Sequence, residues 1–106
     1  MNENYFWHIN KNENSNKVFV LIIYDIVENK IRNKFYKKMK GYGFQVQKSA
    51  FEAIISDSLY KKLLKEVPKL INTEKDSVRI YKMTGYGEIK LFGCSINIEN
   101  EETVII

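Results

Sequence analysis

The segment Val18–Tyr24 constrains the fold most, because seven apolar or aromatic residues follow one another and the carboxylate of Asp25 ends the run. Seven residues are too few to span a bilayer, and a run rich in Val and Ile suits one β-strand. Side chains alternate between the two faces of a strand, so both faces of this one must be covered. Asp25 follows where the strand stops, a common position for the reactive groups of an open sheet.

The composition limits the chain to one domain and excludes several classes of active site. At 106 residues, the chain is long enough for a single modest core. Its one cysteine, Cys94, and its one histidine, His8, exclude an internal disulfide and a Cys/His zinc cluster, and they indicate a reducing cytosol. A nucleophilic triad would need His8, which lies in the polar leader. No segment resembles a membrane span or a signal peptide, so we expect a cytoplasmic protein without a membrane partner.

Positive charge is concentrated in the middle of the chain. Residues 17–93 hold 16 Lys and Arg against 8 Asp and Glu, a net charge of +8, whereas the whole chain carries +4. This distribution favours a polyanion such as nucleic acid as a partner, and the alternative is a lysine-rich, solvated surface. We therefore divide the chain into an N-terminal extension (1–16), one folded domain (17–93) and a C-terminal tail or strand (94–106).

The hydrophobic spacing predicts two helices among five strands. The first helix is expected over 28–40, where Ile31, Phe35 and Met39 form one apolar stripe. The second helix is expected to begin at the capping residues 56–58 and to be kinked or shortened at Pro68. Strands after the first are expected at 44–46, 50–55, 77–81 and 89–91.

This order of elements, β-α-β-β-α-β with an extra C-terminal strand, predicts an α+β fold of the ferredoxin-like type. Such a sheet carries both helices on one face and leaves the other face open. Because the first strand is apolar on both faces, we expect a second copy of the chain to cover the open face in a two-fold homodimer. The alternative is that the leader or the tail folds back over it. We expect residues 95–106 to add as a strand to a sheet edge, because Thr103–Ile106 is apolar.

The first predicted helix carries six cations in eleven residues. Such a cluster repels itself unless a polyanion neutralises it, so these residues are candidate nucleic-acid contacts. A solvated helix face is the alternative. The six residues are Lys30, Arg32, Lys34, Lys37, Lys38 and Lys40.

Asp25 has a structural and a chemical interpretation. The spacing of Asp25 and Glu28 fits a capping box at the start of the first helix. The carboxylate of Asp25 is also a hard oxygen ligand that suits Mg²⁺. No D-x-D or E-x-x-H spacing supplies further ligands, but a two-fold axis near the strand end would bring two copies of Asp25 together. They could then hold one ion that activates water against a phosphodiester. Both interpretations are open at this point.

Four blocks of the sequence, in this order, resemble the CRISPR-associated family called Cas two. The resemblance extends over residues 18–93, and it implies a ferredoxin-like homodimer. The resemblance further implies that this homodimer bridges dimers of an integrase, called Cas one, while new spacers are captured and inserted. The four blocks are Val18–Asp25, the basic helix with Arg32, Gly43–Glu52 and Asp76–Tyr81.

The resemblance also implies a disputed metal-dependent nuclease, usually described as an endoribonuclease, with Asp25 as the catalytic Mg²⁺ ligand. The implied nucleic-acid partners are duplex DNA and single-stranded RNA, with Arg79 as a further basic contact and Tyr24, Ser49 and Phe51 as supporting residues.

The chain departs from the family in its leader and in its first helix, where lysines replace most of the arginines and bidentate phosphate recognition is lost. Two other functions fit the same residues. One is a toxin-like, mRNA-cleaving protein of the virulence-associated protein D type, which shares the Tyr-Asp strand end. The other is a simple RNA-binding module with exposed aromatic residues on an open sheet.

Overall fold

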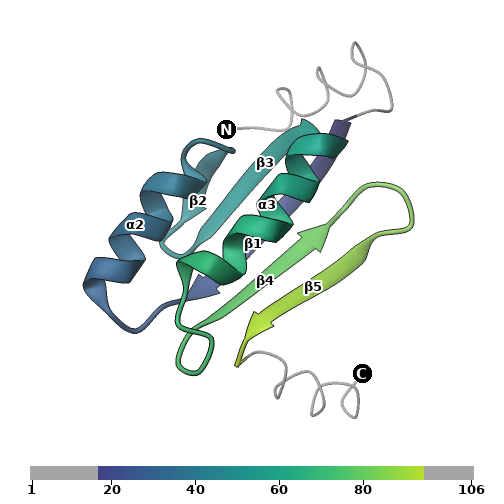
Figure 1. Ribbon diagram of the computed structural model, residues 1–106. Helices are drawn as coiled ribbons and strands as arrows, with labels where there is room; N and C mark the ends of the chain where they lie inside the picture. Colours follow the sequence, from purple (N-terminus) through teal and green to yellow (C-terminus); the bar gives the residue numbers. More distant parts are fainter. Residues whose placement is uncertain (1–16, 95–106) are drawn as a thin grey trace.

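The computed structural model describes residues 17–94, which form one five-stranded sheet and two helices (Figure 1). The predicted order of elements is confirmed. In chain order the elements are β1 (Lys17–Asp25), α2 (Asn29–Met39), β2 (Phe44–Gln47), β3 (Ala50–Ser56), α3 (Asp57–Leu70), β4 (Ser77–Lys82) and β5 (Glu88–Gly93).

The strands lie in the order β2-β3-β1-β4-β5, and every neighbouring pair is antiparallel. The long apolar strand β1 is therefore central: Val20 lies opposite Ala53 of β3 on one side and Lys82 of β4 on the other. The order β2-β3-β1-β4 with its two helices is the ferredoxin-like arrangement, and β5 is the extra strand at the edge beside β4. The predicted fold class is confirmed.

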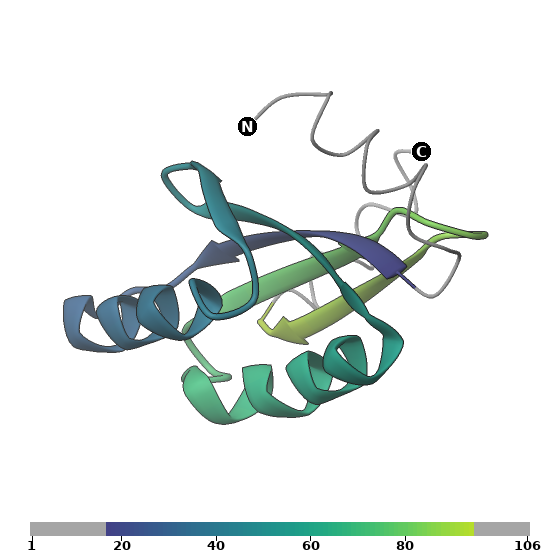
Figure 2. The ribbon, with the colours of Figure 1, turned by 90° about the horizontal axis from the view of Figure 1, so that it is seen from above.

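Both helices cover the same face of the sheet, as the view from above shows (Figure 2). Alternate residues of β1, from Val18 to Tyr24, point toward this helix layer and are buried. Neither α2 nor α3, the helices of residues 17–94, is long and apolar enough to cross a membrane. The other core side chains are Ile26, Phe35, Met39, Phe51, Ala53, Ile55, Tyr60, Leu63, Val67, Val78 and Ile80.

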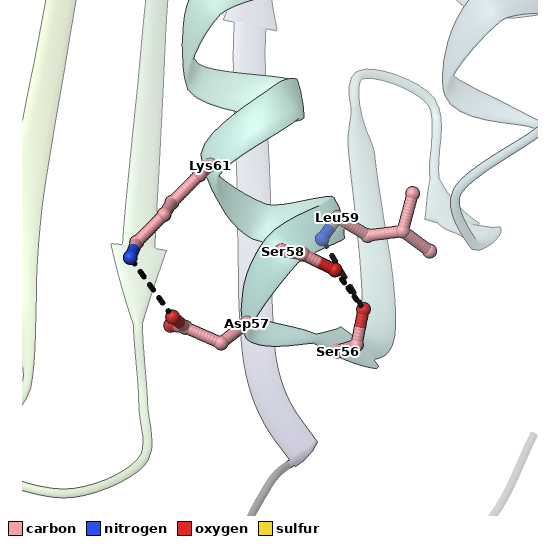
Figure 3. A network of polar contacts seen from close by, with 5 residues as sticks. All are labelled: Ser56, Asp57, Ser58, Leu59 and Lys61. Carbon is pink, nitrogen blue, oxygen red and sulfur yellow. Dashed lines mark hydrogen bonds and ion pairs between the residues drawn. The ribbon is translucent and has the colours of Figure 1, made fainter.

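The start of α3 follows from the predicted capping residues (Figure 3). Ser56 is the N-cap, and its hydroxyl accepts a 3.2 Å hydrogen bond from the backbone N–H of Leu59. Asp57 in the first turn lies 3.3 Å from the Nζ of Lys61, one turn further on. The expected shortening at Pro68 is wrong, because the helix continues to Leu70 and the proline falls within its last turn.

The second face of the sheet, which we call the open face, carries the other half of the apolar residues of β1. No helix or strand within residues 17–94 covers it, so Ile23 is 39% exposed and Ile89 is 58% exposed. The alternative coverings by residues 1–16 or 94–106, and the strand predicted for 95–106, fall almost wholly outside the described residues. The alternation and the strand register place these apolar side chains on the open face: Phe19, Leu21, Ile23, Ile54, Tyr81, Ile89 and Leu91.

Candidate metal site and nucleic-acid interface

Asp25 is the last residue of β1, opposite Ser77 of β4, and its side chain is exposed. The alternation along β1 places it on the open face, in the same row as Ile23. Within residues 17–94, no three His, Cys, Asp or Glu side chains gather closely enough to hold a metal ion. The exposed carboxylate of Asp25 is still compatible with Mg²⁺, an ion that takes one or two carboxylates and keeps several waters.

The capping-box interpretation of Asp25 is wrong. The residue that caps α2 is Glu28, and its side chain makes no capping hydrogen bond. The strand continues through Asp25, so three residues separate Asp25 from the first residue of α2, and its carboxylate points to the sheet face that lacks helices. The chemical interpretation of Asp25 as a metal ligand stays a prediction.

The guanidinium of Arg32 is directed at the loop between β1 and α2. Its Nη1 donates hydrogen bonds to the carbonyl oxygens of Ile26 at 2.5 Å and Val27 at 3.3 Å, and its Nη2 donates to Oδ1 of Asn29. The sequence analysis proposed this residue as a phosphate contact. The structure gives its side chain contacts within the chain, which that analysis did not foresee.

Helix α2, which carries the lysines, lies on one face of the sheet (Figure 2), and the alternation along β1 places Asp25 on the other face. Lys38 lies 3.9 Å from the carboxylate of Glu66, and Lys40 lies 5.4 Å from the centre of the Tyr36 ring. The structure therefore separates the basic helix from the candidate metal ligand. The lysines of this helix surface, all exposed, are Lys30, Lys34, Lys37, Lys38 and Lys40.

Arg79 is apart from these lysines. It lies on β4 opposite Ile23 of β1 and Leu91 of β5, so it shares the open face with Asp25. Its Nη1 lies 3.5 Å from the hydroxyl of Tyr81. A nucleic acid on the helix layer would not reach this residue, because Arg79 lies on the same face of the sheet as Asp25.

The three predicted supporting residues come together at the end of β1, on the helix side of the sheet. The backbone N–H of Tyr24 donates a 3.0 Å hydrogen bond to the carbonyl of Ser49. The Tyr24 ring centre lies 4.8 Å from that of Phe35 and 6.2 Å from that of Phe51, which is fully buried. Burial raises the pKa of Tyr24, and Arg32 opposes this increase. These contacts hold the end of β1 in place beneath the helices.

A depression of about 300 Å³ opens beside Tyr24. Several of its residues were not singled out from the sequence, because no local spacing connects the β2–β3 turn with the first helix. The lining residues are Tyr24, Arg32, Asn33, Tyr36, Gln45, Lys48 and Ser49.

The sequence analysis also did not single out Asp76, which lies near the end of β1. Its side chain is only 1% exposed, and Oδ1 accepts a 3.0 Å hydrogen bond from the backbone N–H of Val27. The signal in the sequence was a carboxylate directly before the strand-forming residues 77–81, in the last of the four blocks.

These features define a ferredoxin-like α+β domain with a basic helix layer and an exposed carboxylate at the end of its central strand. The family model of the CRISPR associated protein Cas2 matches residues 18–88, which is more than half of the chain. The chain belongs to this family, and the resemblance inferred from the four sequence blocks is confirmed.

Known proteins with similar sequences bear nuclease names. The chain is 36% identical over 88 residues to "CRISPR-associated endoribonuclease Cas2" of Mycobacterium tuberculosis (strain CDC 1551 / Oshkosh), covering 83% of this chain and 77% of the relative. It is 34% identical to "CRISPR-associated endonuclease Cas2" of Halalkalibacterium halodurans, covering 83% of this chain and 99% of the relative. A solved structure, described as a hypothetical protein TT1823 from Thermus thermophilus, is 32% identical and superposes with a TM-score of 0.61. That superposition covers 65% of this chain and 84% of the other.

Proposed function

We propose that this chain acts in CRISPR spacer acquisition as a dimeric adaptor that binds duplex nucleic acid between two dimers of the integrase Cas one. The membership in the Cas2 family supports this role, which is the one that the resemblance implies. The exposed lysines of α2 support the binding component, because such a cluster gains from neutralisation by phosphates.

The observation that carries the dimer is the apolar open face. Its β1 residues Leu21 and Ile23 continue a run whose other half forms the core, yet no helix or strand of residues 17–94 covers this face of the sheet. A two-fold axis through this face would bury the same residues of both copies against each other. The two helix layers, with their lysines, would then face outward on both sides of the dimer.

A matched pair of variants tests the dimer. Ile23 is 39% exposed on the open face, and Leu59 is 41% exposed on α3 in the helix layer. Light scattering at micromolar concentration should give a dimer for the unmodified chain and for Leu59→Arg, and a folded monomer for Ile23→Arg. A monomer for the unmodified chain would contradict the proposal.

The names of the relatives support an additional nuclease activity. We propose that this activity depends on Mg²⁺, because Asp25 offers an exposed carboxylate at the end of β1. Because Asp25 lies on the open face, a second copy docked there would contribute a second carboxylate close to the axis. Mg²⁺ held at this place would lower the pKa of a bound water for attack on a phosphodiester. The carboxylate of Asp25 from each copy would hold the ion.

Asp25→Asn separates the enzyme from the adaptor. The exposed side chain of Asp25 keeps its shape in this variant and loses its charge, so the fold should be preserved, and Mg²⁺-dependent cleavage of RNA or DNA should be lost. Asp57→Asn is the control, because Asp57 is an exposed aspartate in the helix layer. We expect spacer acquisition in cells to persist in Asp25→Asn. Cleavage that survives this substitution would show that the metal site is not at Asp25.

The alternatives give different results in the same experiments. A simple RNA-binding module would be a monomer that stacks bases on Phe19 and Tyr81 of the open face, so RNA would quench tyrosine fluorescence. A toxin-like mRNA interferase would cleave RNA without capturing an integrase. Pulldown of an integrase by the tagged chain supports the adaptor over both.

A further inference from the structure

Asp76 is the one charged residue within 17–94 whose side chain is buried. A buried carboxylate is costly unless its oxygens are satisfied, so its hydrogen-bond partners show what it is placed to hold. It follows the turn after α3 and directly precedes β4. Its neighbour Ser77 pairs with Asp25, so the buried carboxylate lies next to the end of β1 that carries the candidate metal ligand.

The backbone of Asp76 is fixed in the turn and against the end of β5. Its N–H donates a 2.7 Å hydrogen bond to the carbonyl of Asn72, and its Oδ2 accepts a 2.8 Å hydrogen bond from the N–H of the same residue. Its carbonyl accepts a 3.0 Å hydrogen bond from the N–H of Cys94. The other carboxylate oxygen, Oδ1, accepts from the N–H of Val27 at 3.0 Å. A rigid turn therefore holds the loop after β1 through one oxygen atom.

Arg32 holds the same loop by donating hydrogen bonds to the backbone carbonyl oxygens of the loop. Its Nη1 lies 2.5 Å from the carbonyl oxygen of Ile26 and 3.3 Å from that of Val27. The N–H of Val27 is thus bound to a carboxylate from the turn before β4, and the carbonyls of the loop are bound to a guanidinium from α2. Residue 26 directly follows Asp25, so the chain leaves the candidate metal ligand in a direction set by both contacts.

We propose that Asp76 and Arg32 form a clamp on loop 26–28 that sets the position of Asp25, so that Asp76 is a positioning residue for the metal site. This inference rests on the proposed function in one respect, namely that Asp25 binds Mg²⁺. Mg²⁺ demands near-ideal octahedral geometry and short distances to its oxygen ligands, so a small displacement of Asp25 weakens its binding. Residues that orient metal ligands typically change metal affinity roughly 10–100-fold when they are replaced.

Asp76→Asn is the sharpest variant, because asparagine has the same shape but only one oxygen. Its NH₂ group, a donor, takes the place of one carboxylate oxygen, so either the N–H of Val27 or the N–H of Asn72 loses its acceptor. In the full chain, we expect faster hydrogen exchange of the Val27 amide and a dissociation constant for Mg²⁺ raised roughly 10-fold, followed at the amides of residues 25–27 by NMR. Cleavage should be slower at low Mg²⁺ and recover at high Mg²⁺, while RNA affinity and the dimer are unchanged. A residue that only supports the fold would not give this recovery.

The control loses a hydrogen bond at the opposite end of the sheet. The hydroxyl of Tyr60 donates a 2.8 Å hydrogen bond to Glu88, which pairs with Lys82 at the far end of β4 from Ser77. Tyr60→Phe removes this bond without contact to loop 26–28. We expect its Mg²⁺ affinity and its Val27 exchange to equal those of the unmodified chain.

Arg32→Lys tests the other half of the clamp and keeps the inference testable if Asp76→Asn does not fold. Lysine preserves the charge, so a change in Mg²⁺ affinity cannot come from a lost cation, but it cannot repeat the contacts of both guanidinium nitrogens. We expect weaker Mg²⁺ binding in this variant too. Folded variants that bind Mg²⁺ like the unmodified chain, when Asp25→Asn does not bind it, would overturn the clamp.

A different set of results is expected if Asp25 does not bind Mg²⁺. If Asp25→Asn leaves Mg²⁺ affinity unchanged, the proposed metal site is wrong, and the clamp is decided by the exchange of the Val27 amide alone. Faster exchange in Asp76→Asn would then support the clamp on the loop, and unchanged exchange would overturn it.

Discussion

The hydroxyl of Tyr42 donates a 2.6 Å hydrogen bond to Oε1 of Glu66, and this bond joins the turn after α2 to α3. Lys38 of α2 lies 3.9 Å from Oε2 of the same carboxylate. The hydrogen bond from Tyr42 is the main reason why the pKa of Glu66 lies below its ordinary value of 4.5, with Lys38 acting in the same direction and burial opposing it. A charge-assisted bond therefore connects the turn after α2 with α3.

Tyr42→Phe should lower the free energy of unfolding by about 1–2 kcal/mol, because it removes this bond and keeps the ring. Urea denaturation at neutral pH measures the loss. A carboxylate with a lowered pKa stabilises the fold above its unfolded pKa, so the difference between the two proteins should shrink as the pH falls below 4.5 through the folded pKa. Tyr86→Phe, at a fully exposed tyrosine, is the control and should have no effect.

The chain should lose stability in alkali through Tyr42 and Tyr60. Burial, and a hydrogen bond to Glu66 or Glu88 respectively, raise the pKa of both phenols well above the ordinary value of 10.0. A raised pKa gives stability that is fully present below the unfolded value and is lost as the pH rises above it, since the unfolded chain releases these protons first. We expect the free energy of unfolding to fall above pH 10. The fall should be shallower in the double variant Tyr42→Phe, Tyr60→Phe, and equal slopes would contradict this account.

Replacing Lys30, Lys34 and Lys37 with glutamine should weaken the binding of duplex DNA and flatten its dependence on salt. These three lysines are exposed on α2, and glutamine preserves the helix. If each contacts one phosphate, the slope of log K against log salt should fall in magnitude by up to about 3. The matched control replaces Lys62, Lys65 and Lys69 of α3 with glutamine, and it should change the salt slope less than the α2 variant does. An unchanged slope in the α2 variant would mean that this surface is only solvated.

Gly93→Ala should destabilise the fold more than Gly85→Ala, although both glycines have positive φ, of 74° and 66°. A Cβ at residue 93 would lie 2.1 Å from the carbonyl oxygen of Asp76, whereas a Cβ at residue 85 would meet nothing within 4 Å. We expect a loss of about 1–2 kcal/mol at Gly85 from backbone strain alone, and at least about 1 kcal/mol more at Gly93. Urea denaturation of the two variants checks this, and equal losses would show that the end of β5 can move away from Asp76.

The fold could be predicted from the sequence because its signals are local. The unbroken run at 18–24, the stripe of Ile31, Phe35 and Met39, and the alternation at 77–81 each report the period of one element, and the structure confirms all three. The capping-box interpretation of Asp25 was wrong for a related reason. A four-residue motif carries no information on how far the preceding strand continues, and pairing with Ser77 extends β1 to Asp25.

The site was less predictable, because its contacts join residues distant in sequence. The hydrogen bond from Val27 to Asp76 spans 49 residues, and no spacing rule connects the two. Arg32 was proposed as a phosphate contact because its charge is visible in the sequence, whereas the direction of its guanidinium depends on the loop carbonyls that its helix faces. The sequence alone gives the charge of Arg32, whereas the direction of its guanidinium follows only from the fold.

The central position of β1 has a consequence for how the chain is made. β1 is synthesised before every other described element, but both of its partners, β3 and β4, follow it by at least 25 residues, while β2–β3 and β4–β5 are hairpins of neighbouring strands. On a ribosome, the uncharged run 18–24 therefore emerges first and must wait for β4 before its second edge is paired. Uncharged, strand-forming segments of this length are those that associate between chains. The nascent chain is thus most prone to aggregation before residue 82 has emerged, and a pause in translation after β5 is safer than one after α2.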